Sequence, residues 1–266
     1  MMKSKWSRAL TLGAFLAFLI LMVWKPVYSE DETAQLLWEM IASRVAGSVI
    51  FLLLLYEFRY SVLQRPRWGH LAILLPAWAV VINNLPILAL ASGMATVDRM
   101  DLIGVFALQS FCVGAFEELA FRGVLFLALL QSRRSSIKQI FWVTVISSAV
   151  FGLIHLANLA EGAGFGATVM QVGYSFLIGA MCSIVLLKTG NLIHCVLLHS
   201  VYNFCGMLLP TLGIGDWWDT PTVIITVVLA VAVSLWMLYT LLCITPKETD
   251  KFYSKIKGDT ETDEHV

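Results

Sequence analysis

The chain has 266 residues, of which 59% are hydrophobic and 14% charged, its mean hydropathy is +0.80, and its formal net charge is zero. Soluble domains carry about 25% charged residues, so this composition excludes an ordinary soluble domain. Aliphatic and aromatic residues are plentiful, which excludes a disordered chain, and we expect an integral membrane protein.

Glycines, prolines and clusters of charge divide the chain into about eight apolar segments. Each is near or above the length of about 20 residues that crosses a bilayer as a helix. In chain order the segments cover 9–24, 35–57, 70–92, 102–130, 138–159, 167–187, 191–210 and 221–244. The predicted fold class is therefore all-α, a polytopic membrane protein of about eight transmembrane helices.

The first apolar segment allows two interpretations. It is short and follows Lys3, Lys5 and Arg8, so it fits a signal peptide cleaved after Ser29. However, Lys25 comes directly after the apolar run, and this favours a helix that is retained in the protein.

The loops alternate sharply in their basic content. The basic set holds Lys3, Lys5, Arg8, Arg59, Arg65, Arg67, Arg133, Arg134, Lys138, Lys188, Lys247, Lys251, Lys255 and Lys257. The other set holds only Lys25 and Arg99, together with several acids. By the positive-inside rule the basic set is cytoplasmic. Both termini are then cytoplasmic, which requires an even number of spans and agrees with eight; the polar tail from Pro246 is expected to be mobile.

The fourth apolar segment contains the stretch FEELAFRG at 116–123. A charged side chain in the middle of a bilayer costs about 2.5–3.5 kcal/mol, so such residues normally face the interior of a bundle. Glu118 and Arg122 are four residues apart and can pair on one helix face. Glu117 points about 100° away from that face. The spacing predicts a structural ion pair and one carboxylate left for other work, with a wholly structural network as the alternative.

Two further polar pairs with the same spacing lie in the fifth and seventh segments, Phe151 with His155 and His199 with Asn203. Counting 1.5 Å per residue from the basic loops places Glu117, His155, His199 and Asn203 about 17–25 Å from the cytoplasmic ends of their helices. In a core of about 30 Å this depth lies between the middle and the outer half. These side chains can therefore meet, and together they predict a hydrolytic centre.

The three motifs resemble those of the CAAX protease and bacteriocin-processing (CPBP, or Abi) family of intramembrane proteases. EExxxR is matched at 117–122, FxxxH at 151–155 and HxxxN at 199–203. The resemblance implies about eight helices around an intramembrane polar cavity. It also implies an enzyme, a CAAX-like intramembrane endopeptidase that hydrolyses a peptide bond of a membrane-associated protein or peptide.

The resemblance also implies a role for each matched residue. Glu117 and His155 would activate a water, while His199 and Asn203 would stabilise the oxyanion. Residues that support the architecture would be Glu118, Arg122 and Phe151. Glu117, His155 and His199 would also suffice as three ligands of a divalent metal such as zinc, with water as the fourth. No HExxH motif is present, so both a metal-dependent and a metal-free site remain open.

On this interpretation the chain divides into four parts. Residues 1–100 form N-terminal transmembrane helices without motifs, 101–210 the catalytic core, 211–245 the last transmembrane helix, and 246–266 a cytoplasmic polar tail. The expected partners are the lipid bilayer and a membrane-associated peptide or protein substrate, with no nucleic acid. The expected location is the cell membrane, in a bacterium.

Three alternatives remain open. The protein could be a non-catalytic bacteriocin self-immunity or regulatory protein that keeps the motifs. It could be a transporter, which also uses intramembrane charges, although no inverted repeat is visible. Cys195 lies four residues before His199 and could act as a nucleophile, although all five cysteines fit buried thiols. The predicted depth favours a membrane-embedded or exported peptide over a prenylated protein cleaved on the cytoplasmic side.

Overall fold

The computed structural model describes residues 5–23, 29–66, 68–131, 137–160, 162–216 and 219–257. The longer helices of this part are α1 (Lys5–Val23), α2 (Glu32–Glu57), α3 (Leu71–Asn83), α5 (Ile103–Glu118), α7 (Ile137–Leu153), α8 (Phe165–Thr189), α9 (Leu192–Leu212), α10 (Thr220–Leu242) and α11 (Pro246–Lys257). The shorter elements are η1 (Trp68–His70), α4 (Ile87–Ser92), β1 (Ala95–Val97), η2 (Met100–Leu102), η3 (Leu119–Phe126), α6 (Leu127–Gln131), η4 (Ile154–Leu159) and β2 (Gly213–Gly215).

The eight apolar segments predicted from the sequence correspond to eight helical runs, which confirms the all-α polytopic fold class. Five candidate spans are long and apolar enough to cross a membrane: α2, Lys138–Leu159, α8, α9 and α10. The fourth run joins α5, η3 and α6 without a break, whereas the third is broken between α3 and α4. Pro76 stays inside α3, and the break falls instead after Asn83, immediately before Pro86.

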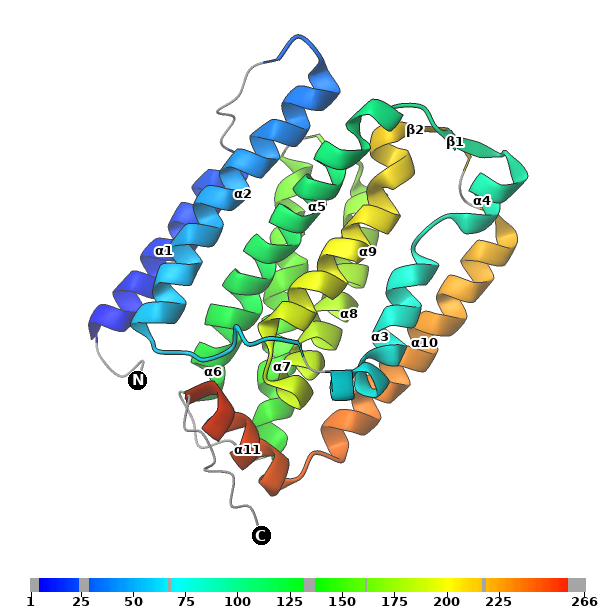
Figure 1. The fold of residues 1–266 in the computed structure, drawn as a ribbon. Coiled ribbons are helices and arrows are strands. Elements are labelled where there is room, and N and C mark those ends of the chain that lie inside the picture. The colour runs from blue at the N-terminus through cyan, green and yellow to red at the C-terminus, as the bar shows by residue number, and fades with distance from the viewer. Residues whose placement is uncertain are drawn as a thin grey trace.

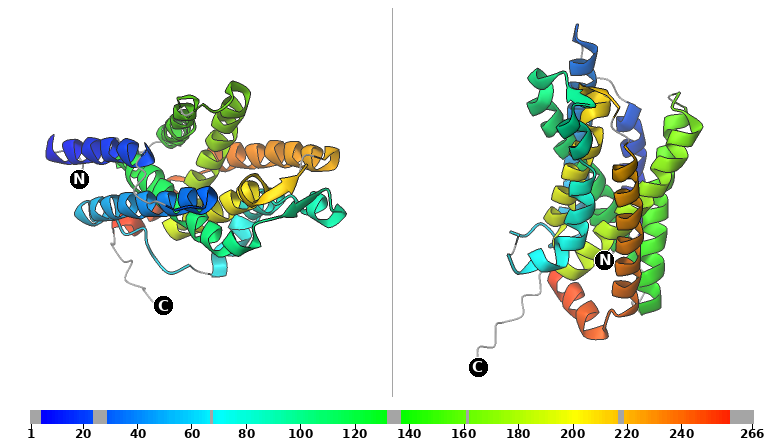
Figure 2. Two further views of the ribbon diagram at one scale, coloured as in Figure 1. Left: turned by 90° about the horizontal axis from the view of Figure 1, so that it is seen from above. Right: turned by 90° about the vertical axis from the view of Figure 1, so that its right-hand side faces the viewer.

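The helices lie side by side as one bundle (Figures 1 and 2). The helix α5 packs along both α2 and α9, and α7 packs along α8. Two close approaches explain the first arrangement. A Cβ atom at Gly47 on α2 would collide with the ring of Phe116, and one at Gly114 on α5 would collide with Ser200 on α9. The C-terminal part of α5 is therefore enclosed on two sides.

One end of the bundle carries a small antiparallel sheet, in which Ala95 pairs with Gly215 and Val97 with Gly213. Figure 1 shows β1 and β2 at the top and α11 at the bottom, and we call these the β end and the α11 end. At the β end, Arg99 forms ion pairs with Asp31 at 2.6 Å and with Asp101 at 2.8 Å. The hydrogen bonds from Arg99 lower the pKa of both carboxyl groups. This ion-paired cluster ties the start of α2 to the loop before α5.

The expectation that the tail from Pro246 is mobile is wrong for its first part, because Pro246–Lys257 forms the helix α11. Phe252 and Ile256, four residues apart, are buried against the bundle. Lys188 pairs with Glu248 at 2.6 Å, and the hydrogen bond from Lys188 lowers the pKa of that carboxyl group. The low overall hydropathy of the tail concealed one apolar stripe on an otherwise charged helix.

Some residues used to predict orientation lie outside the described part of the chain: Lys3, Lys25, Arg67, Arg133, Arg134 and the final stretch 258–266. The start of α1, the loop between α8 and α9, and α11 nevertheless all lie at one end of the bundle (Figure 1). Lys188, Lys247, Lys251, Lys255 and Lys257 therefore share that end, as their assignment to one set of loops predicts.

Candidate active site

The EExxxR stretch crosses a change of helix type. The α-helix α5 ends at Glu118, and the next eight residues, Leu119–Phe126, form a π-helix before α6 resumes. Wider π turns of this kind occur mostly as local insertions in α-helices, frequently at functional sites. The i,i+4 reasoning assumed a regular α-helix here, and the π-helix was not predicted.

The predicted pairing of Glu118 with Arg122 is present. Arg122 Nη1 lies 3.0 Å from Glu118 Oε1, and the side chains of Arg122 and Glu118 are 1% and 0% exposed. The Arg122 guanidinium also lies over the ring of Phe151, 4.4 Å from its centroid. A Cβ at Gly179 on α8 would come within 2.9 Å of Arg122 Nη2, so α8 closes the remaining side. The arginine is thus enclosed by three helical runs.

His199 lies between the two adjacent carboxylates. Its Nδ1 is 2.7 Å from Glu118 Oε1, and its Nε2 is 3.5 Å from Glu117 Oε2. Because Arg122 holds Glu118 as an acceptor, we assign the Nδ1 proton of His199 as the donor in this short hydrogen bond. The Nε2 atom then faces Glu117. Sequence reasoning gave Glu118 only the arginine as a partner and did not anticipate that it also orients a histidine.

The arrangement of charges at this centre can be balanced. Glu118 is matched by Arg122, and Glu117 would be matched by His199 in its doubly protonated form. In that form both ring nitrogens donate, Nδ1 to Glu118 and Nε2 toward Glu117. Buried charges are tolerated more readily when an opposite charge lies beside them, as Arg122 lies beside Glu118.

His155 occupies the edge of the same cluster. It lies in η4, and its Nδ1 is 3.0 Å from the carbonyl oxygen of Phe151. A carbonyl can only accept, so Nδ1 carries the proton and Nε2 keeps a lone pair. The ring of Phe151 lies between the two histidines, with centroids 5.4 Å from His155 and 5.7 Å from His199. Among the described residues, no ion pair within 4.0 Å joins His155 to Glu117.

The predicted depth of His199 is wrong. The count from Lys188 assumed a continuous helix, but α8 ends at Thr189, Gly190 adopts a left-handed conformation (φ 61°), and α9 begins only at Leu192. His199 is therefore about 10 Å from the α11 end of its helix rather than about 17 Å. Glu118 is about as far along the chain from Ile103 as from Gln131, so the centre lies near mid-height.

The three expected metal ligands do not form a compact set in this structure. Within the described chain, the residues whose possible ligand atoms all lie within 4.8 Å of one another are Glu118, Cys182 and Cys195. Glu117 and His199 face one another, but His155 is not among these close neighbours. The mechanism proposed below therefore uses no metal.

Cys195 lies in the interior of the bundle, with its thiol bonded to the backbone of α8. It is fully buried, and its sulfur lies 3.1 Å from the backbone oxygen of Cys182, to which the thiol donates. Asn203 lies one turn after His199 on the same face of α9 and is partly exposed. Of the HxxxN pair, His199 is the residue that faces Glu117, at 3.5 Å.

A second set of intramembrane polar residues was missed at the sequence level. Glu39 is buried on α2 and accepts a hydrogen bond from Gln35 at 2.9 Å. Arg44, also buried on α2, donates to the carbonyl oxygen of Leu21 at 3.0 Å, and its guanidinium lies 5.4 Å from the centroid of the Phe116 ring. The sequence signal for this set was the presence of Glu39 and Arg44 inside the apolar segment 35–57.

An open pocket of about 90 Å³ lies between α3, α8, α9 and α10. Its wall is mainly apolar, with Asn83, Asn84, Tyr174 and Tyr202 among the polar residues that line it. The Nδ2 of Asn84 donates to the carbonyl oxygen of Tyr202 at 2.9 Å, which joins the broken third run to α9.

Comparison with known proteins identifies the region that holds all three motifs. A family model described as type II CAAX prenyl endopeptidase Rce1-like matches residues 99–205. No curated protein and no solved structure matches the chain. The matched residues begin just before α5 and end within α9, so they include the π-helix and both histidine-bearing runs. Residues 99–205 of this membrane protein are therefore similar to the Rce1-like type II CAAX prenyl endopeptidases, which is consistent with the resemblance to the CPBP intramembrane proteases.

Proposed function

We propose that the protein is an intramembrane endopeptidase that hydrolyses a peptide bond of a membrane-associated peptide or protein through a water activated by Glu117 and His155. The observation that carries the proposal is the position of His199 between Glu117 and Glu118, with Arg122 beside the latter. A network used only for packing needs each charge paired once. Here one carboxylate is held by the arginine, and a second, 13% exposed, faces a histidine.

The proposed reaction assigns the proton transfers to this chain's own residues. Glu117 accepts a proton from the water, with the free Nε2 of His155 orienting it, and the hydroxide oxygen bonds to the carbonyl carbon. The tetrahedral intermediate then collapses, the C–N bond breaks, and Glu117 returns the proton to the leaving amine. The products are a carboxylate and an amine, as peptide hydrolysis requires.

His199 and Asn203 are the proposed donors to the oxyanion. A histidine that already donates through Nδ1 to Glu118 can offer a second donor through Nε2 only when it is doubly protonated. Glu118 is therefore proposed to position His199 in addition to pairing with Arg122.

The experiment compares Glu117→Gln with Glu39→Gln. Both glutamates are in the interior of the bundle, but only the first is assigned to the reaction. Purified proteins would be incubated in vesicles with the membrane fraction of the source cell, and new peptide N-termini would be identified by mass spectrometry. We expect the wild type and E39Q to generate the same termini, and E117Q to lose them by about 10²–10⁴-fold in rate.

Identical new termini from wild type and E117Q would show that Glu117 is not the base. Absence of new termini from every folded protein would favour the non-catalytic immunity or regulatory alternative, or transport. The mid-height position of the centre does not distinguish a prenylated substrate from an exported peptide, so the termini themselves would identify the substrate class.

We also infer that the α11 end faces the cytoplasm, because the described basic residues Lys188, Lys247, Lys251 and Lys257 gather there. Reporter fusions after Lys257 should read as cytoplasmic, and reporters inserted after Asp98 as external. An external signal from the reporter after Lys257 would contradict the inferred orientation of the protein. The cell membrane of a bacterium is the proposed location.

A further inference from the structure

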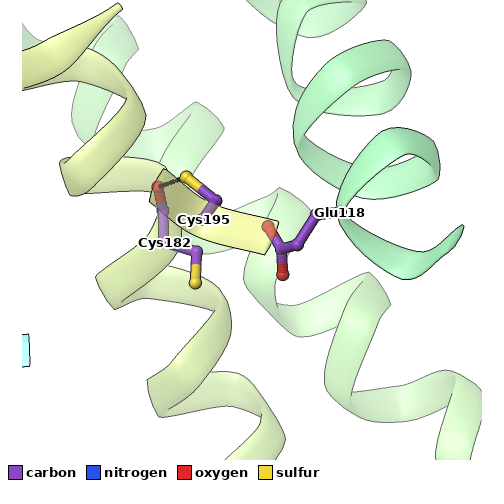
Figure 3. A group of neighbouring side chains, drawn as sticks. All are labelled: Glu118, Cys182 and Cys195. Atoms are coloured by element: carbon purple, nitrogen blue, oxygen red, sulfur yellow. Dashed lines mark hydrogen bonds between the residues drawn. The ribbon is translucent and has the colours of Figure 1, made fainter. Parts of the chain in front are cut away.

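A second group of potential ligands lies beside the Glu118–His199 hydrogen bond. The two thiols of Cys182 on α8 and Cys195 on α9 and the carboxylate of Glu118 on α5 are all fully buried. One ligand atom from each lies within 4.8 Å of the other two. Figure 3 shows the Glu118 carboxylate directed from its helix toward the two cysteines. The cluster therefore joins three helices at one point.

The geometry of this cluster is close to that of a zinc site. Zinc binds thiolate sulfur at about 2.3 Å and carboxylate oxygen at about 2.0–2.2 Å in a tetrahedron, so neighbouring donors are separated by roughly 3.5–3.8 Å. In this structure the three ligand atoms lie within 4.8 Å of one another, a limit about 1 Å longer than the separation of donors around zinc. Small rotations of the side chains would supply three of the four tetrahedral positions without movement of the helices.

One oxygen of Glu118 is available to a ligand. Oε1 accepts from His199 and faces Arg122, but Oε2 is completely buried and has no hydrogen-bond partner among the described residues. Buried carboxylate oxygens are normally satisfied, and an unsatisfied one is unfavourable. A cation held between Oε2 and the two sulfurs would satisfy this atom while leaving the bond to His199 in place.

The charges also balance when a divalent cation is bound. Two thiolates and one carboxylate carry three negative charges, which a divalent ion reduces to one, and Arg122 at 3.0 Å from Glu118 neutralises the remainder. Without the ion, two neutral thiols and the Glu118–Arg122 pair also sum to zero. Binding therefore exchanges two thiol protons for one cation without placing net charge in the membrane interior.

We propose that Glu118, Cys182 and Cys195 bind a thiophilic divalent cation, zinc in the cell, in a closed site that links the α8–α9 hairpin to the end of α5. Two sulfur donors select zinc or cadmium over magnesium and calcium. The site does not use Glu117, His155 or Asn203, and it does not depend on the proposed hydrolysis.

The test uses cadmium as the probe, because cadmium thiolates absorb in the ultraviolet. The full chain, with the exposed Cys243 replaced by serine, would be reduced, stripped of metal and titrated in detergent. The variant Cys182→Ser/Cys195→Ser is compared with Cys112→Ser/Cys205→Ser, which removes the same number of buried thiols. We expect a saturating thiolate band in the parent and in the second variant, and its loss in the first. Equal bands in both variants would overturn the proposal.

A second measurement needs no cysteine variant within the bundle and so does not depend on how well such variants fold. X-ray absorption of the zinc-loaded parent protein should show two sulfur neighbours at about 2.3 Å and oxygen at about 2.0–2.2 Å. A shell of nitrogen and oxygen alone would mean that zinc binds elsewhere, including at the histidines, and would also overturn the proposal.

Discussion

Acid–base pairs occur in two settings in this protein, the middle of the bundle and its two ends. In the middle, Glu118 and Arg122 are 3.0 Å apart and almost wholly buried. At the ends, Arg99 pairs with Asp31 and Lys188 with Glu248, each at 2.6 Å, with side chains between 22% and 43% exposed. The shorter distances are at the ends, yet we expect the larger energetic effects in the middle.

The reason is the surroundings of each pair. Water solvates exposed ions well whether or not they pair, so surface pairs contribute about 0–1 kcal/mol. Loss of one partner from a buried pair leaves an uncompensated charge and costs about 3–5 kcal/mol. The central pair also holds His199, which no ion pair at the ends does within the described residues. Burial, and not distance, thus distinguishes the central pair, which contacts a proposed catalytic residue, from the exposed pairs that hold the ends of the bundle together.

The largest expected effect is on activity, from His199→Ala. Loss of a proposed oxyanion donor should lower the cleavage rate by about 10²–10³-fold. The matched control is His194→Ala, because His194 is a buried histidine on the same helix and forms a hydrogen bond with His70 at 3.2 Å. Rates measured on a substrate found with the wild type would check this. A rate loss of the same size in both variants would contradict the proposed role of His199 as an oxyanion donor.

The next effect is on stability, from Arg122→Ala compared with Arg99→Ala. Arg122→Ala leaves the buried Glu118 without its ion-pair partner and should lower the free energy of unfolding by about 3–5 kcal/mol. The second breaks an exposed cluster and should cost about 1 kcal/mol or less. Unfolding would be followed in mixed micelles of increasing denaturant.

The double variant Glu118→Gln/Arg122→Met sharpens this comparison. It removes both charges, so it should recover much of the stability lost in Arg122→Ala. If Arg122→Ala and Arg99→Ala cost the same, burial would not be what distinguishes the two settings.

The smallest expected effect is a pH-dependent change in stability from the Lys188–Glu248 pair at the α11 end. Lys188 lowers the pKa of Glu248 below its ordinary value of 4.5. A lowered folded-state pKa contributes stability that is complete above the unfolded value, and this stability is lost as the pH falls through the folded value. The contribution is less than about 1 kcal/mol, because Glu248 is 43% exposed.

The thermal midpoints of wild type and Glu248→Gln should therefore differ slightly at neutral pH and converge below about pH 4.5. Lys188→Met should behave like Glu248→Gln. A difference that grows as the pH falls would contradict the assigned sign.

Sequence reasoning located the motif residues but not all of their contacts. The pairing of Glu118 with Arg122 followed from i,i+4 spacing, which survives the change to a π-helix. The bond between Glu118 and His199 could not be predicted, because it joins residues 81 positions apart and depends on how α5 and α9 are rotated toward one another. The contact of Gly114 with Ser200 sets that approach.

The sequence by itself determined the eight apolar helical runs and their approximate extents, because hydrophobic length and breaker residues act locally. It also determined which residues could carry the chemistry, since charges are rare in apolar helices. The tertiary structure alone decided the depth of His199, the docking of α11 and the meeting of Cys182, Cys195 and Glu118. Each of these depends on where a helix ends and which face it presents to a distant neighbour, and packing between helices settles both.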